Sequence, residues 1–68
     1  MTVASQVKQT LAGLKGVQAT LRIYSAQIRD KETESVFLEA LKTTEEVIQD
    51  LEKRIRVLEF EEPQYKGN

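Results

Sequence analysis

The 68-residue sequence contains no cysteine, no histidine and no tryptophan, and only one proline. Without cysteine the chain can form no disulfide, no iron–sulfur cluster and no zinc site with thiolate ligands. Without histidine it lacks the commonest general base near neutral pH and the commonest metal ligand. A chain this short builds a marginal core and usually depends on a disulfide, a metal or a partner chain. These absences favour association with another chain as the source of stability.

Segments that would direct the chain into or across a membrane are also missing. The amino terminus has no basic region followed by an apolar run, as a secretory signal would have. No apolar stretch approaches the ~20 residues that span a bilayer. The formal net charge is −1, whereas dedicated nucleic-acid-binding proteins are usually strongly basic. We therefore expect a cytoplasmic protein with a single domain over residues 1–68.

Apolar residues at seven-residue spacing predict a first helix over about residues 3–28. One row contains Val7, Leu14, Leu21 and Ile28, and the other contains Val3, Val17 and Tyr24. Leu11 widens the stripe, which is typical of a helix that faces a core. Gly13 and Gly16 each cost roughly 1 kcal/mol relative to alanine in a helix interior. They indicate either the close approach of another backbone or simply a weak point in the helix.

A second helix is predicted over about residues 32–61, after a turn at about residues 29–31. Its apolar residues recur in alternating steps of four and three, as in a coiled-coil seam, with Thr44 as the polar exception. Asp30 is the expected N-cap, because its carboxylate can accept hydrogen bonds from first-turn N–H groups. Pro63 disfavours helical geometry at the residue before it, which leaves residues 62–68 as a short polar tail.

The short break between the helices predicts an all-α fold, an antiparallel two-helix hairpin. Its predicted core consists of Val7, Leu11, Leu14, Val17, Leu21, Tyr24, Phe37, Leu41, Ile48, Leu51, Ile55 and Leu58. The expected register pairs Leu14 with Ile48 and brings Tyr24 beside Phe37 near the turn. Apolar residues beside this seam would stay half exposed in a monomer, namely Leu11, Ile23, Val36, Ala40, Val47 and Val57. We therefore expect hairpins to pair into a four-helix bundle, as a homodimer or a tetramer.

Positive charge is concentrated in the first helix and negative charge in the second. The basic stripe consists of Lys8, Lys15, Arg22 and Arg29, and acids repeat at the same spacing at Glu45, Glu52 and Glu59. The expected register places Lys15 near Glu45, and it places Lys8 near Glu52. Charge complementarity that fixes the antiparallel pairing is the favoured interpretation. The alternative is that the basic stripe binds anionic lipid or nucleic acid.

No pattern indicates a catalytic, cofactor or metal site. Carboxylates cluster around Glu45, Glu46 and Asp50 and at residues 59–62, but no Asx-rich loop shapes a calcium cage there. A thin hairpin also has no cleft to raise the pKa of a catalytic carboxylate. Phe60 and Tyr65 lie off the seam, and they either cover the open end of the bundle or anchor another protein.

Three segments resemble a small bacterial family. They are MTVASQVKQTL at residues 1–11, LKGVQATL at residues 14–21 and EEPQYKG at residues 61–67. The resemblance is to the domain of unknown function 1657, which is found mainly in endospore-forming Firmicutes. This family has no established activity and supplies no catalytic residues. The resemblance implies a link to sporulation, adds the spore as an expected location, and slightly favours a recognition role for Tyr65.

Together, these patterns predict a non-enzymatic helical module that associates with itself and with an unidentified protein partner. It would bind no cofactor and would contact a membrane only peripherally. The alternative function is a membrane-surface or nucleic-acid binder that uses the basic stripe.

Overall fold

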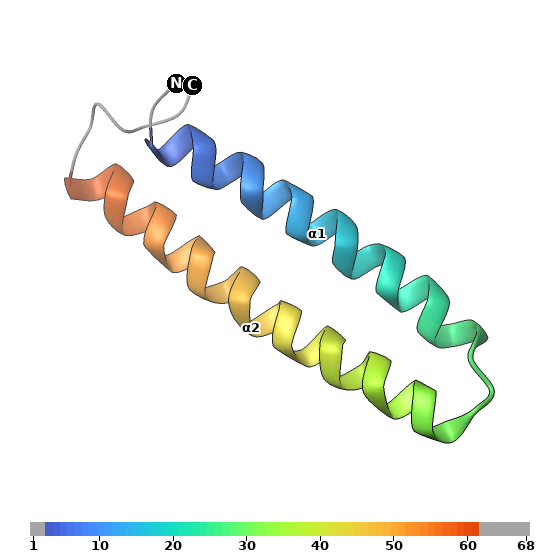
Figure 1. Cartoon of the computed structure of the whole chain (residues 1–68). Helices are drawn as coiled ribbons and strands as arrows, with labels where there is room; N and C mark the ends of the chain where they lie inside the picture. Colours follow the sequence, from blue (N-terminus) through green and yellow to red (C-terminus); the bar gives the residue numbers. More distant parts are fainter. Residues whose placement is uncertain (1–2, 62–68) are drawn as a thin grey trace.

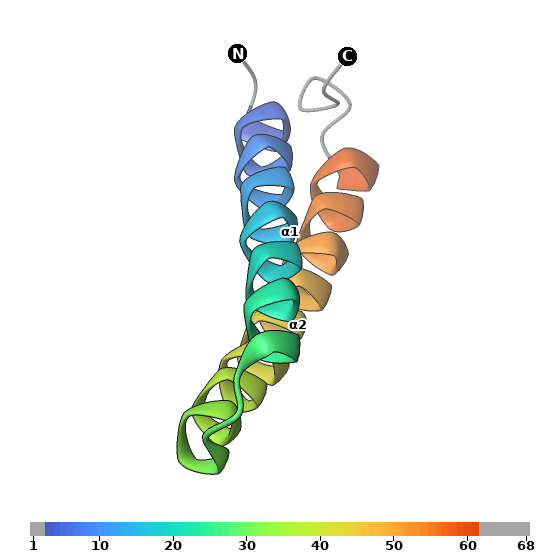
Figure 2. The same ribbon diagram turned by 90° about the vertical axis from the view of Figure 1, so that its right-hand side faces the viewer.

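Two antiparallel helices form the described part of the molecule (Figure 1). The computed structural model describes residues 3–61: helix α1 spans Val3–Gln27, helix α2 spans Lys31–Glu61, and residues 28–30 connect them. The hairpin measures 48 × 16 × 11 Å, and its helices cross at a shallow angle (Figure 2). The prediction of an all-α hairpin is confirmed, and the helices begin and end within one residue of the predicted positions. The tail, residues 62–68, lies outside the described residues.

The turn is closed by the predicted N-cap of α2. The backbone N–H of Thr33 donates to Asp30 Oδ2 at 2.9 Å, and the Thr33 hydroxyl donates to the same oxygen at 2.7 Å. These two bonds, the hydroxyl bond first, hold the pKa of Asp30 below its ordinary value. Glu32 and Glu34 add negative charge to the first turn, which suits the positive end of the helix dipole.

Residues shielded from solvent follow a heptad seam in both helices. In α1 and the turn they are Ala4, Val7, Leu11, Leu14, Gln18, Leu21, Ser25 and Ile28. In α2 the seam consists of Glu34, Phe37, Leu41, Thr44, Ile48, Leu51, Ile55 and Leu58. Only three apolar side chains in the described residues are buried, those of Ala4, Ile48 and Ile55. The rest of the seam is half-buried, except for buried Gln18 and Ser25, so the hairpin has a thin core.

Two predicted core residues lie outside the seam. Val17 is 53% exposed and Tyr24 is 54% exposed, so their assignment to the hairpin core was wrong. Their places are taken by Gln18 and Ser25. The remaining predicted core residues all lie in the seam.

The α1 seam differs from the predicted one because two rows of residues flank the row of Leu14, and α2 can cover only one of them. The row of Val17 is the more apolar, but burying it would turn the basic stripe away from α2. Burying the row of Leu11 and Gln18 instead brings the basic stripe to the edge of the seam, next to the acids of α2. Helix pairing therefore follows the combination of Leu11 and charge rather than hydrophobicity alone.

Candidate interaction surface

One side of the seam carries opposite charges that meet across the two helices. This charged face consists of Lys8, Lys15 and Arg22 of α1 and Glu45, Glu52 and Glu59 of α2. Lys15 Nζ lies 3.1 Å from Glu52 Oε2, and Lys8 Nζ forms an ion pair with Glu59. Each step of seven residues along α1 is thus matched by a step of seven back along α2. Because such partly exposed pairs contribute only about 0.2–1 kcal/mol each, their main effect is to set orientation and register.

The predicted ion pairs were displaced by one heptad. Lys15 pairs with Glu52 rather than Glu45, and Lys8 pairs with Glu59 rather than Glu52. Side chains on a helix lean toward its amino terminus. In an antiparallel pair, flanking side chains therefore meet across neighbouring layers of the seam instead of within one layer.

Glu45 anchors a polar contact that reaches into the seam. Gln18, only 7% exposed, donates from Nε2 to Glu45 Oε1 at 2.6 Å, and Gln49 Nε2 donates to Glu45 Oε2 at 3.0 Å. The Gln18 bond first, then the Gln49 bond, and also the charges of Arg22 and Lys15 lower the pKa of Glu45, while burial acts in the opposite direction. A buried polar residue in a seam disfavours other registers, since sliding would leave it without a partner. Sequence reasoning missed this residue, although its seven-residue spacing from Leu11 placed it in the correct row.

The lowered pKa of Glu45 predicts a specific pH dependence of stability. Native structure favours the charged carboxylate, so its contribution is complete above the unfolded pKa of about 4.3. That contribution is lost as the pH falls through the lower folded-state pKa. We expect the urea midpoint of the wild type to fall between about pH 5 and pH 3, and to fall less in Glu45→Gln.

The neighbouring Glu46→Gln substitution is the matched control for that measurement. Glu46 is exposed and makes no hydrogen bond or ion pair with the described residues. The urea midpoint of Glu46→Gln should vary with pH as that of the wild type does. Identical profiles for Glu45→Gln and Glu46→Gln would contradict the assignment of Glu45.

The other side of the seam is apolar and largely open to solvent. This apolar face consists of Val3, Val17 and Tyr24 of α1 and Val36, Ala40, Val47 and Val57 of α2. All are exposed except Ala40, which is half-buried. The predicted exposure of Val36, Val47 and Val57, and of Ile23 farther round α1, is confirmed. Leu38 is an exposed apolar residue on the opposite side, at the edge of the charged face.

Several polar groups on the apolar face are bonded within their own helices. The Thr10 hydroxyl donates to the Gln6 carbonyl at 3.2 Å, and the Thr20 hydroxyl donates to the Gly16 carbonyl at 3.1 Å. In the same rows of α2 as Val47 and Val57, Arg54 Nε lies 3.2 Å from Asp50 Oδ2, one turn away. The face could therefore lose water without leaving these groups unpaired.

The basic stripe proposed as a binding site is mostly engaged within the hairpin. Lys8 and Lys15 hold ion pairs with α2, and the charge of Arg22 acts on Glu45. Arg29 lies in the connection and forms no ion pair with the described residues. The stripe is thus not an unopposed basic surface, which weakens the case for a polyanion as its ligand.

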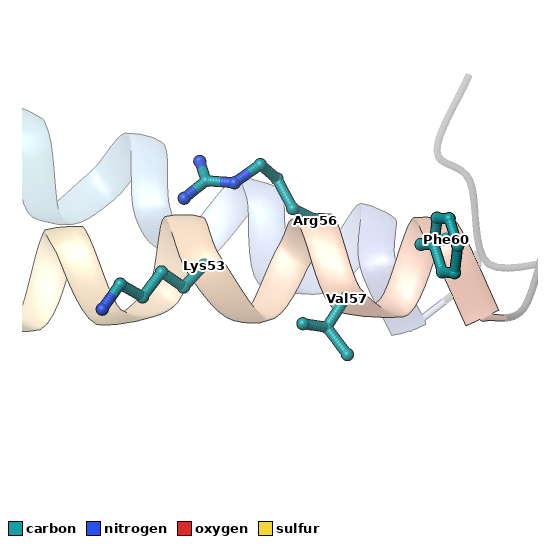
Figure 3. A pocket seen from close by; sticks show the side chains of 4 residues that line it. All are labelled: Lys53, Arg56, Val57 and Phe60. Carbon is teal, nitrogen blue, oxygen red and sulfur yellow. The ribbon is translucent and has the colours of Figure 1, made fainter.

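Phe60 lies at the far end of α2 and is 89% exposed. It lines a shallow hollow together with Lys53, Arg56 and Val57, and all four side chains come from α2 (Figure 3). No second element within residues 3–61 closes this hollow. The predicted partner of Phe60, Tyr65, lies outside the described residues.

The described residues contain neither a metal-binding cluster nor a membrane-spanning helix. Over residues 3–61, no three acidic side chains gather in a way that could hold a metal ion. Neither described helix is long and apolar enough to cross a membrane.

The family model that matches this chain covers residues 7–55 and is described as Protein of unknown function (DUF1657). The chain belongs to this family. The match includes the connection, most of the seam, and the charged residues from Lys8 to Glu52. It leaves out residues 61–67, so the family model does not support that part of the resemblance. No curated protein and no solved structure is detectably similar to the chain.

Proposed function

We propose that this member of DUF1657 is a non-enzymatic helical module that works by self-association, with two hairpins pairing into a four-helix bundle. The observation that carries the proposal is the contrast between a thin core and an extended apolar face. Three apolar side chains of the described hairpin are buried, while six large apolar residues of the apolar face are exposed, namely Val3, Val17, Tyr24, Val36, Val47 and Val57. Burying apolar area stabilises a fold by roughly 25 cal/mol per Å², so covering this face adds the stability that the seam lacks.

The charge distribution favours this function over binding to lipid or nucleic acid. A polyanion would have to compete with Glu52 and Glu59 for Lys15 and Lys8. A second hairpin needs no such exchange, because the apolar face carries few charges. A protein partner of different sequence would bind a surface that the bundle leaves exposed.

Thermal unfolding at several protein concentrations tests the proposal. If folding is coupled to association, the midpoint rises with concentration, because mass action favours the assembled state. The helical signal in circular dichroism reports the transition. A cooperative transition with the same midpoint over a hundredfold range of concentration would contradict self-association.

The family resemblance implies a role in endospore formation and a spore location, and a cytoplasmic location is compatible with both. We propose them as the setting of the module. Immunoblotting of growing and sporulating cells tests this setting, and a chain found only outside the cell would contradict it.

A further inference from the structure

We infer that the apolar face packs on the same face of a second copy that runs in the opposite direction, so that α1 meets α1 and α2 meets α2 about a two-fold axis near Val47. This inference rests on the proposed self-association and specifies its face and its direction. In this arrangement the two connections lie at opposite ends of the bundle.

The choice of face follows from what each side of the hairpin already satisfies. On the charged face, Lys8, Lys15 and Glu45 have partners within the same chain. On the apolar face, Val17 and Val47 are exposed and have nothing to cover them within residues 3–61. Only the apolar face therefore gains from losing its water.

The size of the face matches that of a stable dimer. The hairpin is 48 Å long and 16 Å wide, so one broad face offers a projected area of roughly 770 Å², close to the ~800 Å² that each partner buries in a standard interface. A second copy of the same length would cover the whole face. A short peptide or a small ligand would leave most of it exposed.

The direction follows from symmetry within α2. In a two-fold contact, residue i meets residue j and residue j meets residue i. Val36 and Val57 lie at nearly equal distances along α2 on either side of Val47. An antiparallel copy therefore places Val36 against Val57 of the second copy, Val57 against Val36, and Val47 on its own counterpart.

The middle of α1 supports the same axis. Because Gln18 reaches Glu45, Gly16 of α1 and Val47 of α2 lie at about the same height in the hairpin. A Cβ atom added at Gly13 or Gly16 would meet nothing within 4 Å, so no contact within the described hairpin requires a glycine there. Gly13 lies one turn before Val17 on the apolar face, where a second α1 would use the space, since glycines let helix backbones approach closely, whereas Gly16 shares a row with Ile23 farther round α1.

The alternative two-fold arrangement, with both connections at one end, matches the face less well. It lays α1 over α2 of the second copy, in the same register as within the hairpin. Val36 and Val57 would then lie against Gln27 and Gln6, and Gly13 would lie against Asp50. Those two valines would face polar residues, whereas the antiparallel arrangement pairs them with each other, although it also places Ala40 against Arg54.

Disulfide trapping tests the inference directly, because the chain has no cysteine of its own. Single variants Val36→Cys, Val47→Cys, Val57→Cys and the control Ala19→Cys, on the other side of the hairpin, are oxidised at equal concentration. We expect Val47→Cys to form covalent dimers at least tenfold faster than Ala19→Cys. Val36→Cys and Val57→Cys should link poorly alone and efficiently when mixed with each other.

Three results would overturn the inference, and they separate it from the proposed function. Efficient linking of Val36→Cys to Gln27→Cys, without linking to Val57→Cys, would show both connections at one end. Preferential linking of Ala19→Cys would move the interface to the charged face. In both cases light scattering would still report a dimer and self-association would stand, whereas a monomeric mass for the wild type would overturn both proposals.

Discussion

Replacing Ile48 with alanine is expected to unfold most of the hairpin. Ile48 is 3% exposed and Ile55 is 6% exposed, and these two are the only large apolar side chains of the described residues that are buried. Truncating a buried isoleucine to alanine costs about 2–5 kcal/mol, which is comparable to the whole stability of a core this small. Circular dichroism with urea titration should show a large fall in the midpoint, or no cooperative transition at 25 °C.

Leu38→Ala is the control for that experiment. It removes the same number of carbon atoms as Ile48→Ala, but from a residue that is exposed at the edge of the charged face. Surface substitutions of this kind usually change stability by no more than about 0.5 kcal/mol. If Ile48→Ala and Leu38→Ala were equally mild, the seam around Ile48 would not be the core of the fold.

Replacing Val17 with glutamate is expected to separate the proposed dimer. A charge without a partner in a buried contact costs about 3–5 kcal/mol, and a two-fold assembly contains the substitution twice. The dissociation constant should therefore rise by at least 100-fold. Sedimentation equilibrium of Val17→Glu should give a monomer at concentrations where the wild type is dimeric.

Ala19→Glu is the matched control for Val17→Glu. The two positions are two residues apart in α1, but Ala19 lies beside the charged face and is exposed. Both substitutions add the same charge and have the same helix propensity at the new residue. Equal effects of the two substitutions on the dissociation constant would show that charge alone, and not the apolar face, controls association.

The residues that set local structure could be recognised from the sequence. Asp30 caps α2 because its carboxylate can reach the first-turn N–H groups, and this depends only on neighbouring residues. The position of Ile48 and Ile55 in the seam of α2 follows from a spacing that one helix alone displays. These features do not depend on which partner the helix meets.

The seam of α1 was harder to predict because its apolar stripe is wider than one partner helix can cover. Hydrophobicity favours Val17 and Tyr24, whereas the structure buries Gln18 and Ser25 and leaves the more apolar row exposed. A wide stripe is what a helix needs when it packs against two neighbours. The misassigned residues are therefore those that the proposed bundle would bury.

The most direct measurement of self-association is the molar mass in solution, by light scattering coupled to size exclusion. The proposed bundle predicts a mass near twice the 7.8 kDa of the chain, unchanged over a range of concentrations and between low and high salt, because an apolar interface is little affected by screening. A folded species at the mass of one chain at every concentration would contradict self-association.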